Sequence, residues 1–253
     1  MPRKARTKSS TGVYHIILRG INKQTIFEDE EDKRKFIKTL AKYKEISGFE
    51  LYGYCLMDNH VHLLLKEIRE SLATILKRIS SSYVYWYNEK YERIGHLFQD
   101  RYKSENVEND TYFLTVLRYI HQNPLKAGLV KSVWDSNWTS IHEYVHNIEF
   151  VNIDKGFLLF STNRKTALVK FIVYMQETND DLCLDLEKRA KLSDDQLREC
   201  LFEAGVTHNS MLQQMDRRNR NVVLANLKNL EGVSIRQISR VTGISKSVID
   251  RIK

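Results

Sequence analysis

The segment 54–65 limits the possible folds more than any other part of the chain. It contains two apolar stretches separated by Asp58-Asn59, a pattern typical of an antiparallel β-hairpin. The second stretch begins His60-Val61-His62 and continues through three leucines. Because side chains alternate between the faces of a strand, both imidazoles lie on one face, spaced to bind one metal ion. The leucines predict a central strand covered on both faces. A buried strand that happens to carry two histidines would show the same short motif.

Composition narrows the class of partner. The chain of 253 residues has a formal net charge of +8 and an isoelectric point near 9.2. This basic balance favours an anionic partner, and nucleic acid is the first candidate. With 42% hydrophobic and 28% charged residues, the composition is that of a globular protein. The length suits one large domain, or a medium domain and a small one.

No segment of the sequence predicts a membrane span or a secretory signal. No apolar run approaches the roughly 18 residues that cross a bilayer, and no apolar segment follows the basic residues 1–10. Cys55, Cys183 and Cys200 lack metal-binding or redox spacing, so reduced thiols are expected. We therefore predict a cytoplasmic protein with no membrane partner. Its basic arm, residues 1–10, is either a solvated tail or a phosphate contact.

The residues around the hairpin predict the order β-α-β-β-α-β. A strand is expected within residues 11–20, and a helix from residue 29 or 30 to residue 47, ended by Gly48. Residues 49–57 and the histidine strand form the hairpin. A second helix is expected over 71–91 with Ser71 as its cap, followed by an extended segment within 95–107. This order matches the ferredoxin-like split βαβ unit.

One more helix follows, predicted over residues 111–122. Asp110 opens it, and Asn123-Pro124 closes it because proline cannot continue the hydrogen-bond ladder. The fold class predicted is therefore α+β. It consists of a ferredoxin-like split βαβ domain, with a central antiparallel sheet and its helices on one face, and an all-helical C-terminal region.

The third helix carries a candidate nucleophile. Tyr119 and Asn123 are four residues apart, so both side chains project from one helical face. A tyrosine near a metal site suits metal-assisted attack on a phosphodiester, because its hydroxyl can form a phosphotyrosine link that conserves bond energy for rejoining. Two histidines and one oxygen ligand suit Mg²⁺ or Mn²⁺, and nothing in the pattern excludes zinc. A helix tyrosine packed against the sheet is the alternative interpretation of Tyr119.

Together these motifs resemble a known family, the single-tyrosine HUH transposases. The resemblance is closest to the insertion-sequence single-strand transposases and the group similar to REP-associated tyrosine transposases. It covers roughly residues 11–145. Four motifs in the same order carry it: Arg19-Gly20-Ile21-Asn22-Lys23, His60-Val61-His62 after Asp58-Asn59, Gly95 to Tyr102, and Tyr119 to Leu129.

The resemblance implies a metal-dependent endonuclease and strand transferase that acts on single-stranded DNA. By analogy, Tyr119 is the nucleophile and leaves a 5′-phosphotyrosine, while His60 and His62 are metal ligands. Asn123 is the expected third ligand, preferred over Gln122, which lies on another face of the helix. The histidines His15, His96 and His121 are not expected to be ligands, since none shares the strand of the pair. The family binds hairpin ends and differs in whether it dimerises, so a homodimer remains open.

Basic and aromatic residues near the predicted site are candidates for DNA contact. They suit phosphate binding and base stacking on a single strand, although ordinary surface charge would look the same. The candidates are Arg19, Asn22 and Lys23 after the first strand, Arg101, Tyr102 and Lys103 before the third helix, and Arg118 beside the nucleophile.

The end of the chain predicts a helix-turn-helix. Ser234 and Ser245 cap two short helices, and Gly243 forms the turn. Lys246, Ser247 and Arg251 are placed on the exposed face of the second helix, where they would enter a major groove. A helical hairpin with no DNA role is the alternative. The predicted shared core consists of Ile238, Val241, Ile244, Val248, Ile249 and Ile252.

These observations predict four segments. They are the basic arm (1–10), the catalytic domain (11–150), a helical linker region (151–230) and the helix-turn-helix (231–253). The predicted function is transposase-type cleavage and rejoining of single-stranded DNA. Two alternatives remain: a replication-initiator or relaxase-like nickase, and a domesticated DNA-binding regulator without catalysis.

Overall fold

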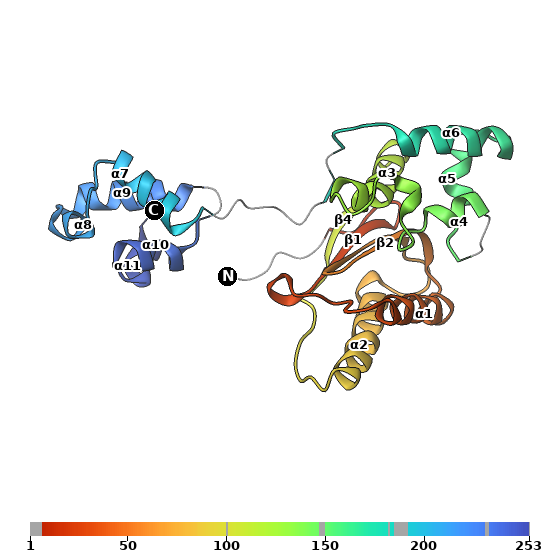
Figure 1. The fold of residues 1–253 in the computed structure, drawn as a ribbon, viewed down its shortest axis with the longest axis horizontal. Coiled ribbons are helices and arrows are strands. Elements are labelled where there is room, and N and C mark those ends of the chain that lie inside the picture. The colour runs from red at the N-terminus through yellow and green to blue at the C-terminus, as the bar shows by residue number, and fades with distance from the viewer. Residues whose placement is uncertain are drawn as a thin grey trace. The chain divides into compact units, whose positions relative to one another are not determined.

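The predicted hairpin lies within a four-stranded antiparallel sheet in the computed structural model (Figure 1). β2 (Glu50–Met57) and β3 (His60–Lys66) pair with each other, and β3 pairs on its other side with β1 (Val13–Arg19). The short β4 (Lys103–Asn106) pairs with the outer side of β1, so the strand order is β2-β3-β1-β4. Because β3 lies between β1 and β2, the sheet has the split βαβ arrangement and the predicted α+β class is confirmed.

The chain forms two compact units, Met1–Leu184 and Asp185–Lys253. The structure describes residues 7–99, 101–146, 150–181, 183–184, 192–230 and 233–252. Residues 1–6 of the predicted basic arm lie outside the described residues. Each unit is treated by itself below.

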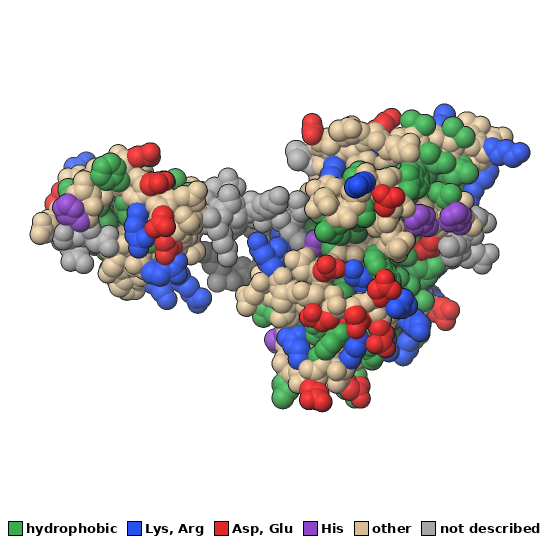
Figure 2. All heavy atoms as spheres, in the orientation of Figure 1, with side chains coloured by type: hydrophobic (Ala, Val, Ile, Leu, Met, Phe, Trp, Pro, Cys, Tyr) green, Lys and Arg blue, Asp and Glu red, His purple; other side chains and the backbone are tan. Residues whose placement is uncertain are grey.

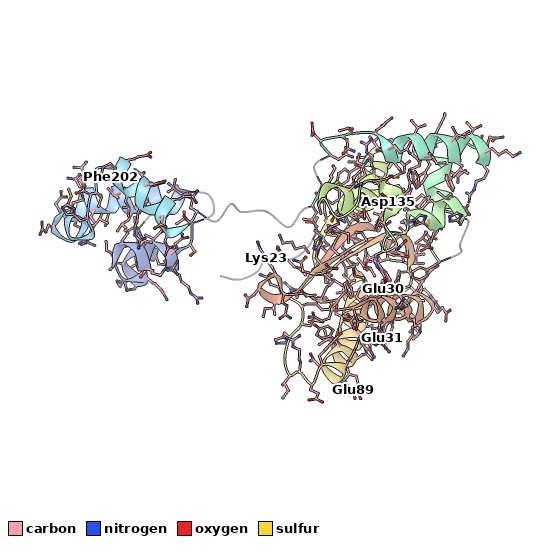
Figure 3. All side chains as sticks on the ribbon, in the orientation of Figure 1. Lys23, Glu30, Glu31, Glu89, Asp135 and Phe202 are labelled. Carbon is pink, nitrogen blue, oxygen red and sulfur yellow. The ribbon has the colours of Figure 1, made fainter. Side chains whose placement is uncertain are left out.

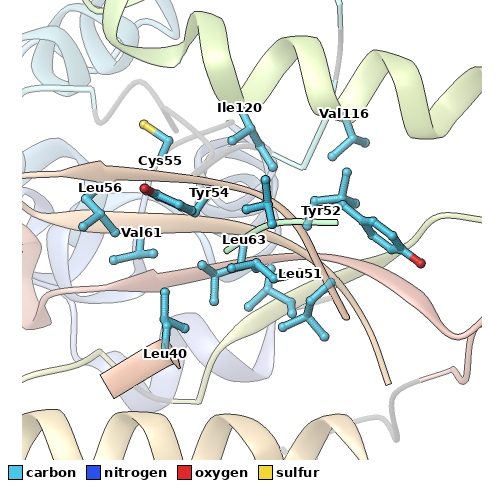
Figure 4. Packing of buried hydrophobic residues seen from close by; sticks show 14 of the residues in the cluster. Leu40, Leu51, Tyr52, Tyr54, Cys55, Leu56, Val61, Leu63, Val116 and Ile120 are labelled. Atoms are coloured by element: carbon cyan, nitrogen blue, oxygen red, sulfur yellow. The ribbon is translucent and has the colours of Figure 1, made fainter. Parts of the chain in front are cut away.

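Two helices cover one face of the sheet, as predicted for a ferredoxin-like unit. α1 (Glu30–Ser47) connects β1 to β2, and α2 (Leu72–Lys90) connects β3 to β4 (Figure 1). A capping box at Asp29 begins α1, and the left-handed Gly48 ends it. Figure 4 shows Leu40 of α1 and Val61 of β3 on this side of the sheet, while Val116 and Ile120 lie on the other side.

The prediction of helices on one face does not hold for α3 (Asp110–Lys126), which covers the opposite face (Figure 4). The strand residues on that face include Ile17, His62 and Leu64, which are at most 1% exposed. An apolar strand face of this kind needs a second layer to exclude water, and α3 supplies it.

The predicted end of this helix was also wrong, because α3 continues through Pro124 to Lys126. Proline in the last turn removes only one intrahelical donor. The later N–H groups still find acceptors, since Ala127 donates to the carbonyl of Asn123 and Leu129 to that of Pro124, both at 3.0 Å. Asn123 therefore has a helical backbone, which keeps its side chain in line with Tyr119.

Three further helices pack against the outer side of α3. They are α4 (Ile141–His146), α5 (Asp154–Leu158) and α6 (Arg164–Gln176). The ring of Phe171 stacks on Tyr144 with centroids 4.7 Å apart and meets Phe157 edge-on at 5.6 Å. The predicted boundary near residue 150 therefore differs from the division after Leu184, because the aromatic residues beyond 150 complete the core of the first unit.

The described residues of the second unit form five short helices around a separate apolar core. They are α7 (Asp194–Glu203), α8 (Asn209–Gln214), α9 (Arg217–Asn229), α10 (Ile235–Thr242) and α11 (Lys246–Arg251). α10 and α11 occupy the predicted helix-turn-helix, and Gly243 between them has the left-handed conformation. Val248 was wrongly placed in the shared core: it is 39% exposed, because it points away from the side of α11 that carries the buried Ile249.

In the part of the chain that the structure describes, no helix is both long and apolar enough to cross a membrane.

Candidate active site

The two histidines of β3 point toward α3, as the alternation of the strand requires. Their ring centroids are 4.9 Å apart, and the rings meet edge to face. His62 is fully buried, whereas His60 is half-buried at the end of the strand. The pair therefore spans from the core to the edge of the domain, with one ring in each environment.

α3 brings Tyr119 and Asn123 to the same place. The Tyr119 ring lies 5.6 Å from the His62 ring, centroid to centroid, and Tyr119 is 6% exposed. The amide nitrogen of Asn123 is 3.4 Å from His62 Nε2. Three residues predicted from two motifs, His60, Tyr119 and Asn123, thus converge around the His62 imidazole.

A third histidine, His15 of β1, joins the site. Its Nε2 is 3.0 Å from His62 Nδ1, and the two rings stack at a centroid distance of 5.3 Å. His15 also meets the Tyr119 ring edge-on at 5.8 Å. The sequence reasoning missed this contact because it compared residues within one strand. In the observed register Ile17 is opposite His62, so His15 is a diagonal neighbour on the same face.

Burial keeps the imidazoles of His62 and His15 neutral. Desolvation lowers the pKa of His62 well below the usual value of 6.5, and the neighbouring His15 and His60 lower it further. Desolvation alone lowers the pKa of His15 to about 3. Neutral rings keep a lone pair available for a metal ion at physiological pH.

The donor set suits a divalent ion that accepts nitrogen and oxygen ligands. His60 Nδ1 is 2.6 Å from Asn59 Oδ1, so Nδ1–H donates a hydrogen bond to the amide oxygen and Nε2 keeps its lone pair. Within the described residues, no group of three or more His, Cys, Asp and Glu side chains is arranged to hold a metal. A site here therefore depends on two imidazoles and the Asn123 amide, which would have to present its oxygen.

The loop after β1 lies beside the histidine pair. Arg19 is directly opposite His60 in the β1–β3 register, and the amide of Asn59 donates to the carbonyl of Lys23 at 3.3 Å. Asn22 and Lys23 are exposed and have left-handed backbones. Figure 3 shows Lys23 at a tip of the first unit. Three of the predicted DNA contacts therefore lie next to the candidate metal ligands.

The segment before α3 is only partly aligned with the site. Lys103 is opposite Ile17, which is opposite His62, so the exposed Lys103 shares the face of the histidines. Arg101 is also exposed. Tyr102 is half-buried and packs against the core, which limits the ring surface that it can offer for base stacking.

Arg118 is not available for the DNA contact predicted for it. It is 8% exposed, and its guanidinium donates two hydrogen bonds to Asp181, at 2.8 and 3.0 Å, and one to Glu177 at 3.0 Å. Two carboxylates neutralise the charge, and the guanidinium carbon lies 4.0 Å from the ring centroid of Tyr174. Arg118 therefore ties α3 to the segment that follows α6.

The other candidate ligands lie outside the site. Gln122 donates to the carbonyls of Met175 and Glu177, at 2.9 and 3.0 Å, on the far side of the helix from Asn123. His121 is fully buried with its Nε2 2.8 Å from Ser140 Oγ. His96 is an exposed residue of the loop before β4.

Surface charge differs between parts of the first unit. Figure 2 shows acidic and basic side chains interspersed over α1 and α2. Lys90, for example, forms ion pairs with Asp29, Glu31 and Asp32 at 2.8 to 3.0 Å. Charges paired in this way offer little attraction to a phosphate backbone, so this face is a poor candidate for binding DNA.

In the second unit, the predicted groove residues are accessible. Lys246, Ser247 and Arg251 are all exposed on α11. Arg240 of α10 is instead paired with Asp194 through two hydrogen bonds of 2.6 and 2.8 Å. Exposed basic residues of the motif thus include Arg236 on α10 as well as Lys246 and Arg251 on α11.

The first unit is similar to known transposases. Residues 8–123 match the family described as "Transposase IS200 like". The fold is similar to that of a REP-associated tyrosine transposase bound to a REP hairpin, with 18% sequence identity and a TM-score of 0.50 over 61% of this chain and 90% of that chain. A "putative transposase" from Deinococcus radiodurans R1 matches with 19% identity and a TM-score of 0.35 over 50% of this chain and 97% of that chain. No curated protein matches the chain.

The family match contains β1 to β4 and α3 up to Asn123, so it includes every residue of the site described above. The similar fold of the REP-associated enzyme agrees with it. Both findings support a transposase role and confirm the resemblance seen in the sequence. Residues 8–123 of this chain therefore match the IS200-like transposase family.

Proposed function

We propose that the first unit cleaves and rejoins single-stranded DNA, with Tyr119 as the nucleophile. The observation that carries this proposal is the convergence on His62. The Tyr119 ring lies 5.6 Å from it and the Asn123 amide 3.4 Å from it, and both side chains come from one face of α3. A nucleophile and three possible metal ligands in one place are the parts that this chemistry requires.

In the reaction, the Tyr119 oxygen attacks the scissile phosphorus. A phosphorus–oxygen bond to the tyrosine forms as the bond to the 3′-oxygen breaks. The tyrosine hydroxyl loses its proton, and the departing 3′-oxygen gains one. The products are a 5′-phosphotyrosine and a free 3′-hydroxyl. Because this ester retains the energy of the original bond, attack by a 3′-hydroxyl rejoins the strand and restores Tyr119.

His60, His62 and Asn123 would hold the metal ion. When bound, Mg²⁺ or Mn²⁺ withdraws electron density from the scissile phosphate and offsets its developing charge. Asn59 fixes the ring orientation of His60 through a contact of 2.6 Å. The mixed nitrogen and oxygen donors favour Mg²⁺ or Mn²⁺, and zinc is also compatible with them.

DNA would approach along the loop after β1. Arg19 has a buried Nε without a hydrogen-bond partner among the described residues, directly beside His60. A phosphate oxygen would satisfy this donor. Lys23, Arg101 and Lys103 extend the positive surface, Asn22 adds a neutral polar contact, and Tyr102 adds a smaller contact. The similar enzyme is bound to a REP hairpin, and we propose hairpin ends as the substrate of this chain also.

The decisive experiment is the detection of a covalent adduct. Labelled single-stranded hairpins taken from the genomic flanks of the coding region are incubated with the full chain and Mg²⁺ or Mn²⁺, then separated on a denaturing gel. Wild type should form an adduct that a chelator prevents. Tyr119→Phe should form none while its hairpin affinity stays within about twofold, because only a hydroxyl is lost. Tyr85→Phe is the control, since Tyr85 is 73% exposed on α2. An undiminished adduct with Tyr119→Phe would refute the nucleophile.

A second candidate function is a DNA-binding regulator that no longer cuts. The exposed Lys246, Ser247 and Arg251 of the helix-turn-helix favour it. Tight duplex binding with no adduct on any flanking hairpin would support this candidate. A replication-initiator or relaxase-like nickase would form the same adduct, but its substrate would lie at a replication or transfer origin rather than in flanking hairpins. A cytoplasmic location and the subunit number remain predictions.

A further inference from the structure

We propose that His15 and Glu105 are positioning residues. They keep the ring proton of His62 on Nδ1, so that the lone pair of its Nε2 is available to the metal. This inference rests on the proposed function, since it concerns a ligand of the proposed metal site. It adds two residues, from β1 and β4, that none of the sequence motifs singled out.

The argument begins at Asn123. Its amide nitrogen can only donate a hydrogen bond, and it faces His62 Nε2 at 3.4 Å. His62 Nε2 is therefore the acceptor and carries no proton. A neutral imidazole has one ring proton, so that of His62 lies on Nδ1. This is the tautomer that a metal ligand bound through Nε2 must adopt.

The tautomer of His15 follows from that of His62. The Nδ1–H of His62 points to His15 Nε2 at 3.0 Å, so this nitrogen must accept. The proton of His15 consequently lies on its own Nδ1. That atom is buried and has no hydrogen-bond partner among the described residues, and a carboxylate oxygen of Glu105 lies 4.0 Å away. The negative charge favours a proton on the side of the ring that faces it.

The fold holds Glu105 in place for this role. Glu105 is directly opposite His15 in the β1–β4 register, so the two side chains share a face of the sheet. Its carboxylate oxygen accepts hydrogen bonds from the hydroxyl of Tyr112 at 2.5 Å and from the backbone N–H of Leu184 at 2.8 Å. A carboxylate, two imidazoles and the metal position thus lie in sequence across three strands, as in the carboxylate–histidine–metal arrangements of other proteins.

His121 offers a matched comparison within the same unit. It is fully buried like His15, and its Nε2 is hydrogen-bonded, but to Ser140 rather than to a ligand. If His15 only filled space, the loss of either imidazole would have similar consequences. If His15 positions His62, only its loss will change the tautomer of His62 and the affinity for metal.

The test combines two measurements on the full chain. Mn²⁺ binding is measured from the electron paramagnetic resonance signal of the free ion, and the ring protons of His62 are located in the metal-free protein by long-range ¹H–¹⁵N NMR. His15→Leu should weaken Mn²⁺ binding roughly 10- to 100-fold and shift the His62 proton toward Nε2. His15→Gln retains an acceptor and should weaken binding only a few-fold. His121→Leu should change neither reading.

Two results would overturn the inference. One is a wild-type His62 that carries its proton on Nε2; the other is an affinity loss with His15→Leu no larger than with His121→Leu. A wild-type protein that binds no Mn²⁺ contradicts the metal site of the proposed function instead. In that case the NMR reading still decides whether His15 sets the His62 tautomer, because it needs no metal. Unfolding curves of each variant confirm that the comparison concerns folded protein.

Discussion

At the scale of single residues, the buried histidines serve two different purposes. Within the described residues, His15, His62 and His121 have no exposed surface. Two of them contact each other in the site, whereas His121 holds α3 against the loop before α4 through Ser140. All three have a lowered pKa, for the same reason of desolvation. A lowered pKa alone therefore does not distinguish a ligand from a packing residue, and the hydrogen-bond partners do.

The pKa of His121 predicts how stability responds to acid. It is about 3 in the folded protein, against 6.5 as the ordinary value. The unfolded chain therefore takes up a proton as pH falls below about 6.5, and the folded chain does not. Acidification favours unfolding, and stability that is complete above about 6.5 is lost progressively down to about pH 3. Between pH 7 and 5 this one group should cost about 2 kcal/mol.

Urea unfolding at both pH values tests this number. All three tryptophans, Trp86, Trp134 and Trp138, lie in the first unit, so their fluorescence reports its unfolding alone. His121→Leu should lower stability at pH 7, because it removes a buried hydrogen bond. Its further loss between pH 7 and 5 should be smaller than that of wild type by about 2 kcal/mol. An identical pH dependence of stability in both proteins would mean that folding does not lower the pKa of His121.

At the scale of elements, α3 has two functional faces. Tyr119 and Asn123 point to the histidines, while Arg118, Gln122 and Lys126, each four residues apart, bind the segment after α6. Asn179 in that segment accepts from Lys126 at 2.9 Å and donates to Gln122 at 2.8 Å. The segment after α6 therefore binds the face of α3 opposite the histidines and fixes the position of Tyr119.

Arg118→Met should weaken this attachment. The change removes three charged hydrogen bonds and the contact with Tyr174, and it leaves Asp181, whose side chain is 14% exposed, without its partner. We expect a loss of about 2–3 kcal/mol in tryptophan-detected unfolding and faster hydrogen exchange of α3 amides. Arg34→Met breaks an exposed pair with Glu30 on α1 and should cost about 0.5 kcal/mol or less. Similar losses from both would show that Arg118 contributes no more than a surface pair.

Local signals in the sequence were sufficient for the strands of the sheet, for the starts of α1, α2 and α3, and for the position of two histidines on one strand face. Caps such as Asp29 and Ser71 placed the helices, and strand alternation placed His60 and His62 together. The end of α3 was misplaced because proline was expected to end the helix. The last turn of α3 instead accommodates Pro124. His15 and Arg118 were misjudged for another reason. Their partners, His62 and Asp181, lie 47 and 63 residues away, and only the strand register or the packing of α6 brings them into contact.

At the scale of the whole molecule, the chain combines two separately packed units. The core of the first unit is built around the sheet, and that of the second unit around leucine, isoleucine and valine residues in its described part. Ile238 of α10 and Ile249 of α11 belong to the second core, together with Leu224 of α9. The helix-turn-helix is therefore an integral part of a helical unit. Deleting residues 231–253 would expose the remaining core, so surface substitutions are the better test of DNA binding.

The exposed charges of α11 predict a defined salt effect. Lys246 and Arg251 are exposed, and each would neutralise one phosphate if α11 enters a groove. Replacing both with glutamine should weaken duplex binding and reduce the slope of log affinity against log salt by about 2, since each phosphate contact contributes about 0.9. Fluorescence anisotropy with the full chain between about 50 and 200 mM salt measures this slope. Arg198→Gln on α7 is the control, because Arg198 already pairs with Asp195. A slope that the double variant leaves unchanged would exclude α11 from the DNA contact and favour a helical hairpin with a purely structural role.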